Sequence, residues 1–107
     1  MVTVPEKIFE VISEYTSIIS NEITIEKIFL FGSYANGTYH EDSDIDLAIF
    51  SKDFSDETQM EDMLFLLKKS WGLGFDIEPQ PFTLEDYEDP VGIVEEILNT
   101  GMELKVV

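Results

Sequence analysis

The sequence predicts an α/β (α+β) domain in which helices and β-strands alternate along the chain. Two patterns support this: apolar residues recur at helical spacing in three segments, and β-branched and aromatic residues cluster in three others. The predicted helices cover residues 5–20, 56–71 and 90–99, and the predicted strands cover residues 23–31, 44–50 and 75–82. Residues 102–107 are expected to add a short terminal strand. With 107 residues, the chain is expected to be one domain, 1–107, with a single core.

The first helix is expected to begin at Pro5, because proline suits the first turn of a helix. Its apolar residues recur every three or four positions and should face the core: Ile8, Val11, Ile12, Tyr15, Ile18 and Ile19. The strand that follows should end at Gly32, where Gly32 and Ser33 lead into a short helix. Residues 36–43 contain many turn formers and no periodicity, which indicates a surface loop with an exposed His40.

The second half of the chain continues the alternation. In the 56–71 helix, the apolar residues on one face are expected to belong to the core rather than to form a base-stacking platform. These residues are Met60, Met63, Leu64, Leu67 and Trp71. Strand 75–82 contains Pro79 and Pro81, so it should lie at a sheet edge or stop near Glu78. Thr83 resembles a helix cap, and Gly101 fits the left-handed position just past the last helix. The core candidates of that helix are Val94, Ile97 and Leu98.

The charge of the chain argues against several classes of partner. The chain has 23 acidic residues against 6 lysines and no arginine, which gives a net charge of -17. Because Lys and Arg supply most of the affinity for phosphate backbones, no direct nucleic-acid partner is expected. An acidic surface instead favours encounter with a basic protein or with cations. Cysteine is absent, and no apolar run approaches the ~20 residues that span a bilayer, so we expect a cytoplasmic protein without a membrane partner.

Asp44 and Asp46 are the first candidates for a metal site. They flank Ile45 in a predicted strand, where alternate side chains point to the same face and Cα atoms two residues apart are separated by ~6.6 Å. The two carboxylates could share one or two cations, and without a cation they would repel each other. Magnesium suits such ligands, because it prefers oxygen and is commonly shared with substrate phosphates. The alternative is that both are merely solvated. The expected buried set of this strand is Ile45, Leu47 and Ile49, with Ala48 and Phe50 on the carboxylate face.

Gly32 and Ser33 precede this acidic pair and are candidates for phosphate binding. A glycine lets phosphate approach the backbone without a Cβ in the way, and the amides at a helix start supply donors and the positive end of a dipole. Ser33 adds a hydroxyl. A glycine-serine pair alone is a common turn, so the prediction of a nucleotide-triphosphate and metal site depends on its combination with Asp44 and Asp46.

A third acid is needed to hold two metals and to deprotonate an attacking hydroxyl. Strand 75–82 offers Asp76 and Glu78, which share one face of that strand. One of them should complete the site. The alternative is that both only decorate the exposed side of an edge strand.

The stretch from Phe31 to Gly37, followed by Ser43 to Leu47, resembles the signature of the minimal nucleotidyltransferases of the DNA polymerase beta superfamily. The resemblance covers nearly the whole chain. It implies a small mixed β-sheet flanked by about four helices. It also implies Mg²⁺-dependent transfer of a nucleoside monophosphate, with two metal ions, from a triphosphate such as ATP to an acceptor hydroxyl, with release of pyrophosphate.

Particular site residues follow from this resemblance. Those that it implies are Gly32 and Ser33 for the triphosphate, and Asp44, Asp46 and Glu78 for metal binding and catalysis. Asp76 also fits the hydrophobic-acid-hydrophobic pattern of the family, so it stays an alternative to Glu78. Many relatives carry arginine where this chain has Asn36, and no other arginine exists. Lysines, the metals or residues of a partner would then have to offset the phosphate charge.

Small solitary members of this family resemble the antitoxin of two-gene systems in which the partner is a HEPN-domain ribonuclease toxin. The resemblance therefore implies an antitoxin that transfers AMP from ATP to a hydroxyl of such a toxin, for example a tyrosine. Two alternatives stay open: an antitoxin that blocks a basic ribonuclease by binding alone, and a nucleotidyltransferase that acts on a small molecule. Apolar helix faces could equally serve a homo-oligomer, and the sequence does not decide between these uses.

Overall fold

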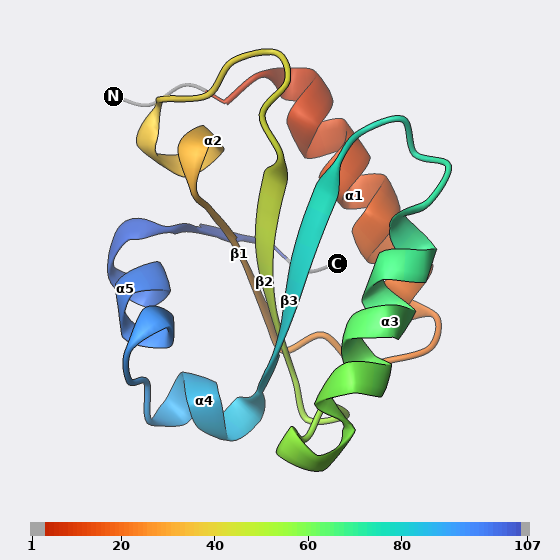
Figure 1. The fold of residues 1–107 in the computed structure, drawn as a ribbon, viewed down its shortest axis with the longest axis vertical. Coiled ribbons are helices and arrows are strands. Elements are labelled where there is room, and N and C mark those ends of the chain that lie inside the picture. Colours follow the sequence, from red (N-terminus) through yellow and green to blue (C-terminus); the bar gives the residue numbers. More distant parts are fainter. Residues whose placement is uncertain (1–3, 106–107) are drawn as a thin grey trace.

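The computed structural model describes residues 4–105, and these form a mixed four-stranded sheet with helices on both sides (Figure 1). The strand order is β3-β2-β1-β4; β1 is antiparallel to β2 and β4, whereas β2 and β3 are parallel. The elements in chain order are α1 (Glu6–Ser20), β1 (Lys27–Phe31), α2 (Ser33–Asn36), β2 (Ile45–Ser51), the 3-10 turn η1 (Asp56–Thr58), α3 (Gln59–Ser70), β3 (Ile77–Thr83), α4 (Leu84–Glu88), α5 (Ile93–Thr100) and β4 (Met102–Leu104). The predicted α/β class is confirmed.

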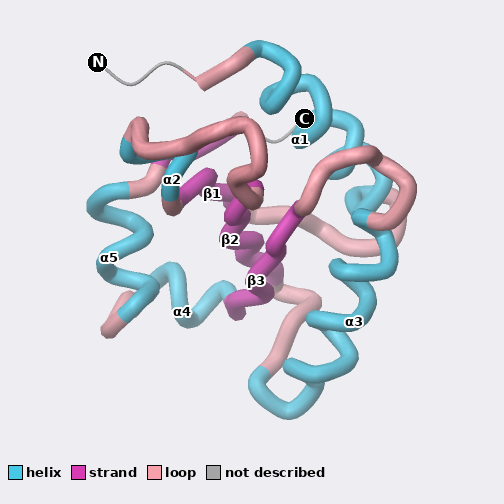
Figure 2. Tube along the Cα trace, turned by 45° about the horizontal axis from the view of Figure 1, so that its top comes forward, coloured by secondary structure: helices cyan, strands magenta, loops and turns pink. Residues whose placement is uncertain are grey.

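The helices cover the sheet in two layers, with α1 and α3 on one face and α4 and α5 on the other (Figure 2). As predicted, Ile45, Leu47 and Ile49 of β2 are buried, and they pack toward α1 and α3. The opposite face of β2 is also buried, because Ala48 and Phe50 pack with Val94 and Ile97 of α5. The strand that carries the acidic pair is therefore the rigid centre of the domain.

Helix α1 follows its predicted bounds closely, with Pro5 as its N-cap. Of the predicted core residues of this helix, all are buried except Ile18, which is half-buried. The hydroxyl of Tyr15 donates to the carbonyl of Leu66 at 2.7 Å, which ties α1 to α3 inside the core. The phenol keeps its proton, because burial raises the pKa of Tyr15 well above its usual value.

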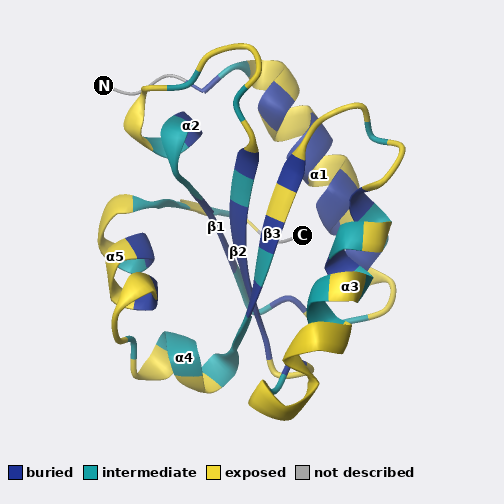
Figure 3. Cartoon of the chain, viewed as in Figure 1, coloured by how far each residue is buried: buried dark blue, intermediate teal, exposed yellow. Residues whose placement is uncertain are grey.

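Helix α3 buries a different face from the one predicted (Figure 3). Met60, Leu64 and Trp71 are 70%, 47% and 73% exposed, so their assignment to the core was wrong. The buried residues are Leu66 and Ser70, which lie one turn apart. Residues 63–67 are all apolar, so the sequence does not define one narrow apolar face. Packing against the sheet and α1 then determines which side of the helix is buried.

The strand predicted at residues 23–31 is shorter in the structure, where β1 begins at Lys27. The backbone N–H of Thr24 donates to the carboxylate of Asp53 at 2.8 Å, and the N–H of Lys52 donates to that of Glu26 at 2.8 Å. Side chains rather than a neighbouring strand thus take up part of the backbone hydrogen bonding in this region. Residues 23–26 therefore form a connecting segment, although their β-propensity alone predicts a strand.

Strand β3 lies at a sheet edge, one of the two predicted outcomes for its prolines, and it continues past Glu78 to Thr83. Thr83 then caps α4 as predicted: its hydroxyl accepts from Asp86 N–H at 3.1 Å, while its own N–H donates to the Asp86 carboxylate at 3.0 Å. Val94 and Ile97 are buried as predicted, and Leu98 is half-buried. Of the expected terminal strand, residues 106 and 107 lie outside the described residues.

Gly101 does not adopt the left-handed conformation predicted for it, since its φ is −81°. The structure gives another reason for glycine here. Gly101 connects α5 to β4, and a Cβ on it would lie 2.6 Å from the carbonyl oxygen of Ile97 and 3.1 Å from that of Leu30. Close approach of two backbones, rather than backbone conformation, therefore requires glycine at this position.

No helix among residues 4–105 combines the length and the apolar character that a membrane crossing requires.

Replacing Gly101 by alanine should lower the free energy of unfolding by about 1–3 kcal/mol, because the new methyl group must displace α5 or β1. Urea denaturation of the variant would measure this loss. Asn99→Ala, an exposed change in the same helix, should stay within about 0.5 kcal/mol of the unchanged protein. Equal stability of the two variants would contradict the close-approach explanation.

Candidate active site

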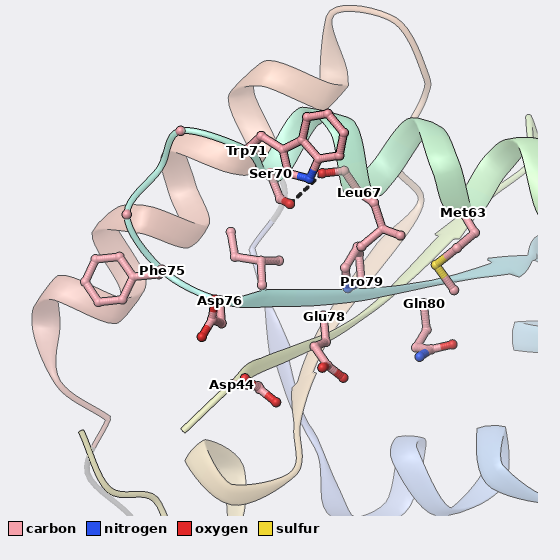
Figure 4. A pocket seen from close by; sticks show the side chains of 13 residues that line it. Asp44, Met63, Leu67, Ser70, Trp71, Phe75, Asp76, Glu78, Pro79 and Gln80 are labelled. Atoms are coloured by element: carbon pink, nitrogen blue, oxygen red, sulfur yellow. Dashed lines mark hydrogen bonds between the residues drawn. The ribbon is translucent and has the colours of Figure 1, made fainter. Parts of the chain in front are cut away.

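Asp46 and Glu78 lie side by side on the face of the sheet that α4 and α5 cover. They occupy paired positions of the parallel strands β2 and β3, so their side chains point to the same face. Asp44 lies two residues before Asp46, and Figure 4 shows its carboxylate near that of Glu78. The three carboxylates predicted from the sequence are thus brought together at one end of the sheet.

Gly32 lies directly against Asp46. Phe31 pairs with Asp46 across β1 and β2, and the chain turns at Gly32 with a φ of +75°. A Cβ on Gly32 would collide with the Asp46 carboxylate. Both the backbone conformation and the contact therefore require glycine, and both place the glycine-serine turn next to the acidic pair.

Ser33 begins the short helix α2, as the sequence predicts. The N–H groups of Ala35 and Asn36 donate to the carbonyl of Gly32, each at 3.1 Å. The N–H groups of Ser33 and Tyr34 precede these and, as at any helix start, have no carbonyl within the helix to bind. The turn therefore presents backbone donors and the Ser33 hydroxyl beside the carboxylates.

The carboxylates repel one another. The pKa of Asp46 is raised to about 6, first by burial and then by the charges of Glu78 and Asp44. The pKa of Glu78 is also raised, by burial, by the charge and a hydrogen bond of Asp44, and by the charge of Asp76. Each acid thus destabilises the charged form of its neighbours, which is the situation that a bound cation relieves.

The two candidates for the third carboxylate occupy different positions. Glu78 pairs with Asp46 inside the sheet, whereas Asp76 precedes β3 and its carbonyl accepts the N–H of Ile45 at 2.8 Å. Figure 4 shows both side chains on the same side of the strand. The register favours Glu78 as the partner of Asp46, with Asp76 at the outer rim of the cluster.

Residues 4–105 contain no group of three acidic or histidine side chains already close enough to enclose a metal ion. The candidate ligands Asp44, Asp46 and Glu78 nevertheless offer only carboxylate oxygens, which Mg²⁺ prefers. The close packing of Gly32 against Asp46 also fixes one of them. The residues present fit a magnesium site whose remaining ligands come from outside the chain, as substrate phosphates and waters do.

Asn36 is the last residue of α2 and leads into the loop that connects α2 to β2. The Asn36 amide oxygen accepts the Thr38 hydroxyl at 2.6 Å and the Thr38 N–H at 3.1 Å, so this side chain closes the loop. Tyr34 stacks on Tyr39 with ring centroids 4.7 Å apart, which fastens the loop to α2. His40 is exposed as predicted, and its Nδ1 accepts the Asp42 N–H at 3.2 Å.

Sequence reasoning missed one part of this region. Trp71 was assigned to the core, yet it is exposed and lines an open cavity that also contains Asp44, Asp76 and Glu78 (Figure 4). Phe75 lines the same cavity. Gly72 and Gly74, both with positive φ, turn the chain between Trp71 and Phe75. In the sequence, these two glycines were the signal from which this turn could have been predicted.

A mixed sheet that carries a glycine-serine turn beside paired carboxylates defines a nucleotide-transfer class of enzyme. Residues 8–101 match the family model described as the nucleotidyltransferase domain, and the chain belongs to this family. The resemblance stated from the sequence is thereby confirmed at the level of the enzyme class.

Particular relatives agree with this assignment. The chain is 28% identical over 102 residues to a Methanocaldococcus jannaschii protein named putative protein adenylyltransferase, covering 92% of this chain and 99% of the relative. A crystal structure of a putative nucleotidyltransferase from Sulfolobus solfataricus aligns with a TM-score of 0.63 at 17% identity, over 77% of this chain and 72% of that one. A toxin-antitoxin structure with AMP-PNP aligns with a TM-score of 0.58 at 22% identity, over 89% and 73% of the two chains. Both structural likenesses support the fold.

Gly32→Ala should destabilise the protein by more than Gly72→Ala does. Both glycines have positive φ, so both changes strain the backbone, but a Cβ at Gly72 meets no atom within 4 Å whereas one at Gly32 meets the Asp46 carboxylate. We expect Gly32→Ala to cost about 1–3 kcal/mol more in urea denaturation. Equal losses for the two variants would argue against the contact with Asp46.

Asp46→Asn should stabilise the protein in the presence of EDTA at pH 7.5. The pKa of Asp46 is raised in the folded state, so the folded protein favours the protonated acid, and this stabilisation is lost as pH rises through about 6. The amide removes the charge, so the gain in melting temperature should shrink as pH falls to about 4, near the usual aspartate pKa. Exposed Glu10→Gln is the matched control and should show no such pH-dependent gain. A lower melting temperature for Asp46→Asn at pH 7.5 would contradict the repulsion.

Proposed function

We propose that this protein is a Mg²⁺-dependent nucleotidyltransferase that transfers AMP from ATP to a hydroxyl, such as a tyrosine, of a HEPN-type toxin, and so acts as its antitoxin. The observation that carries the proposal is the contact of the Gly32 turn with Asp46, which puts phosphate-binding amides beside paired carboxylates. Membership of the nucleotidyltransferase family supports the reaction type.

Asp44, Asp46 and Glu78 would hold the magnesium ions, with Asp76 as the alternative to Glu78. When bound, the metal supplies positive charge to the phosphates of ATP. This contribution matters here because the cavity beside the carboxylates is lined by no lysine or histidine. Gly32 and Ser33 would hold the triphosphate through backbone N–H groups and the serine hydroxyl.

In the proposed reaction, the acceptor oxygen forms a bond to the α-phosphorus of ATP. The bond from this phosphorus to the bridging oxygen of the β-phosphate breaks, and pyrophosphate leaves with that electron pair. The acceptor proton passes to the Glu78 carboxylate, because burial and the neighbouring acids raise the pKa of this group and so make it a stronger base than an exposed glutamate. AMP is then joined to the acceptor through a phosphodiester.

Three observations support a protein acceptor. The Methanocaldococcus jannaschii relative is named as a protein adenylyltransferase, and one structural neighbour is a toxin-antitoxin complex with AMP-PNP. The net charge of -17 favours encounter with a basic protein. The HEPN identity of the toxin and the tyrosine acceptor come from the family resemblance of the signature around Asp44 and Asp46.

The test is transfer of label from α-³²P-ATP to a purified HEPN-domain toxin of the same genome in the presence of Mg²⁺. The unchanged protein should label the toxin, and Asp44→Asn should lower the rate by about 100-fold or more, because it removes charge on which the transition state depends. Glu10→Gln, an exposed carboxylate-to-amide change on α1, should leave the rate unaltered. EDTA should abolish labelling.

Undiminished labelling by Asp44→Asn would contradict the proposed role of this residue. Absence of labelling by the unchanged protein, together with toxin neutralisation by an Asp44→Asn and Asp46→Asn double variant in cells, would favour the alternative of an antitoxin that acts by binding alone.

A further inference from the structure

The outer edge of β3 borders an open cavity of about 730 Å³ with two chemically different walls (Figure 4). On one side of the strand, Met63, Leu67 and Trp71 form an apolar wall. On the other side, Asp44, Asp76 and Glu78 form an acidic wall. We call this cavity the β3 groove. It joins an exposed apolar surface directly to the proposed catalytic carboxylates.

The apolar wall is exposed although its residues are large. Trp71 is 73% exposed and Phe75 is 38% exposed. Gly72 and Gly74, both with positive φ, turn the chain between them, so the outward position of the two rings is set by the backbone of a short turn. An exposed tryptophan next to two half-buried apolar side chains, Met63 and Leu67, is typical of an interaction surface.

The backbone of the β3 edge offers acceptors and few donors. The carbonyl of Asp76 accepts from Ile45 of β2, so in the alternating ladder the backbone groups of residues 77, 79 and 81 face away from β2. Two of these residues are Pro79 and Pro81, which have no N–H. Further along, the N–H of Thr83 donates to Asp86. The groove therefore presents carbonyls and carboxylates together.

We infer that the β3 groove binds the acceptor protein through a short basic segment that carries an aromatic side chain next to the accepting hydroxyl. The inference rests on the proposed function, since it names how the acceptor is held. The aromatic side chain would pack on Trp71. Lysine or arginine side chains, which only donate hydrogen bonds, match the carbonyls of the edge and the carboxylate of Asp76 at the outer rim of the acidic cluster.

Charge disfavours the other occupants of the groove. Away from the proposed magnesium ligands, a triphosphate in the groove would meet the apolar wall and Asp76, and among residues 4–105 no lysine or histidine lines the cavity. A second copy of the chain would bring another net charge of -17 to the same surface. A basic protein segment is the occupant whose charge and hydrogen-bond donors complement both walls.

Trp71 is the single tryptophan of the chain, so its fluorescence reports on the groove. The probe is a short peptide in which lysines surround one phenylalanine and one tyrosine, compared with the same peptide with glutamate in place of lysine. The lysine peptide should shift Trp71 emission to shorter wavelength, and about 0.5 M salt should weaken the effect. The glutamate peptide and Mg²⁺-ATP should leave the emission unaltered.

One variant connects the groove to transfer. Trp71→Ser should raise the KM for the acceptor toxin by about tenfold or more, with the KM for ATP and the melting temperature unchanged, because its side chain is exposed. Val91→Ser is the matched control: Val91 is 70% exposed and does not line the groove. It should leave all three quantities unaltered.

Each contrary outcome has a distinct meaning. No emission change with the lysine peptide up to about 5 mM would overturn the inference. A shift with Mg²⁺-ATP alone and a higher KM for ATP in Trp71→Ser would assign the groove to the nucleotide. A shift that depends on protein concentration would assign it to self-association. Peptide binding without any transfer by the unchanged protein would overturn the proposed function and leave the groove as a docking site.

Discussion

The packing of the Gly32 backbone against the Asp46 carboxylate is the constraint on which the rest of this site depends. It fixes the end of β1 beside the middle of the site, and it leaves the acidic side chain little freedom to move away from Glu78. Because β2 is buried on both faces, the carboxylates cannot relieve their repulsion by shifting the strand. The fold thus holds like charges together, at a cost in stability that positive charge from outside the chain would offset.

The distribution of lysines agrees with this need. Lys27 pairs with Glu103 at 3.1 Å and lies over the Tyr87 ring, and Lys69 pairs with Glu22 at 2.6 Å. Neither lines the cavity beside the carboxylates. The Asn36 side chain, which carries no charge, accepts the Thr38 hydroxyl. Cations and the acceptor are therefore the groups expected to supply positive charge at the site.

Local patterns predicted the strands, the glycine-serine turn and the alternation that sets Asp44 and Asp46 on one face, because each depends on residues close together in the sequence. The choice between Asp76 and Glu78 depends on the register of β2 with β3, which no local pattern contains. The prediction of which face of α3 is buried was wrong, because residues 63–67 are uniformly apolar and only packing against the sheet sets the rotation of the helix about its axis. The glycine at position 101 was identified, but one of the two close contacts that require it is with the carbonyl of Leu30, seventy-one residues earlier in the chain.

The two prolines of β3 have a consequence for selectivity. A sheet edge with regular N–H groups and carbonyls accepts almost any extended chain, since backbone pairing is indifferent to sequence. Pro79 and Pro81 withhold the donors that such pairing requires. Any chain that binds at this edge must be held through its side chains, so binding there depends on the sequence of the bound chain, whereas pairing with a regular edge would not.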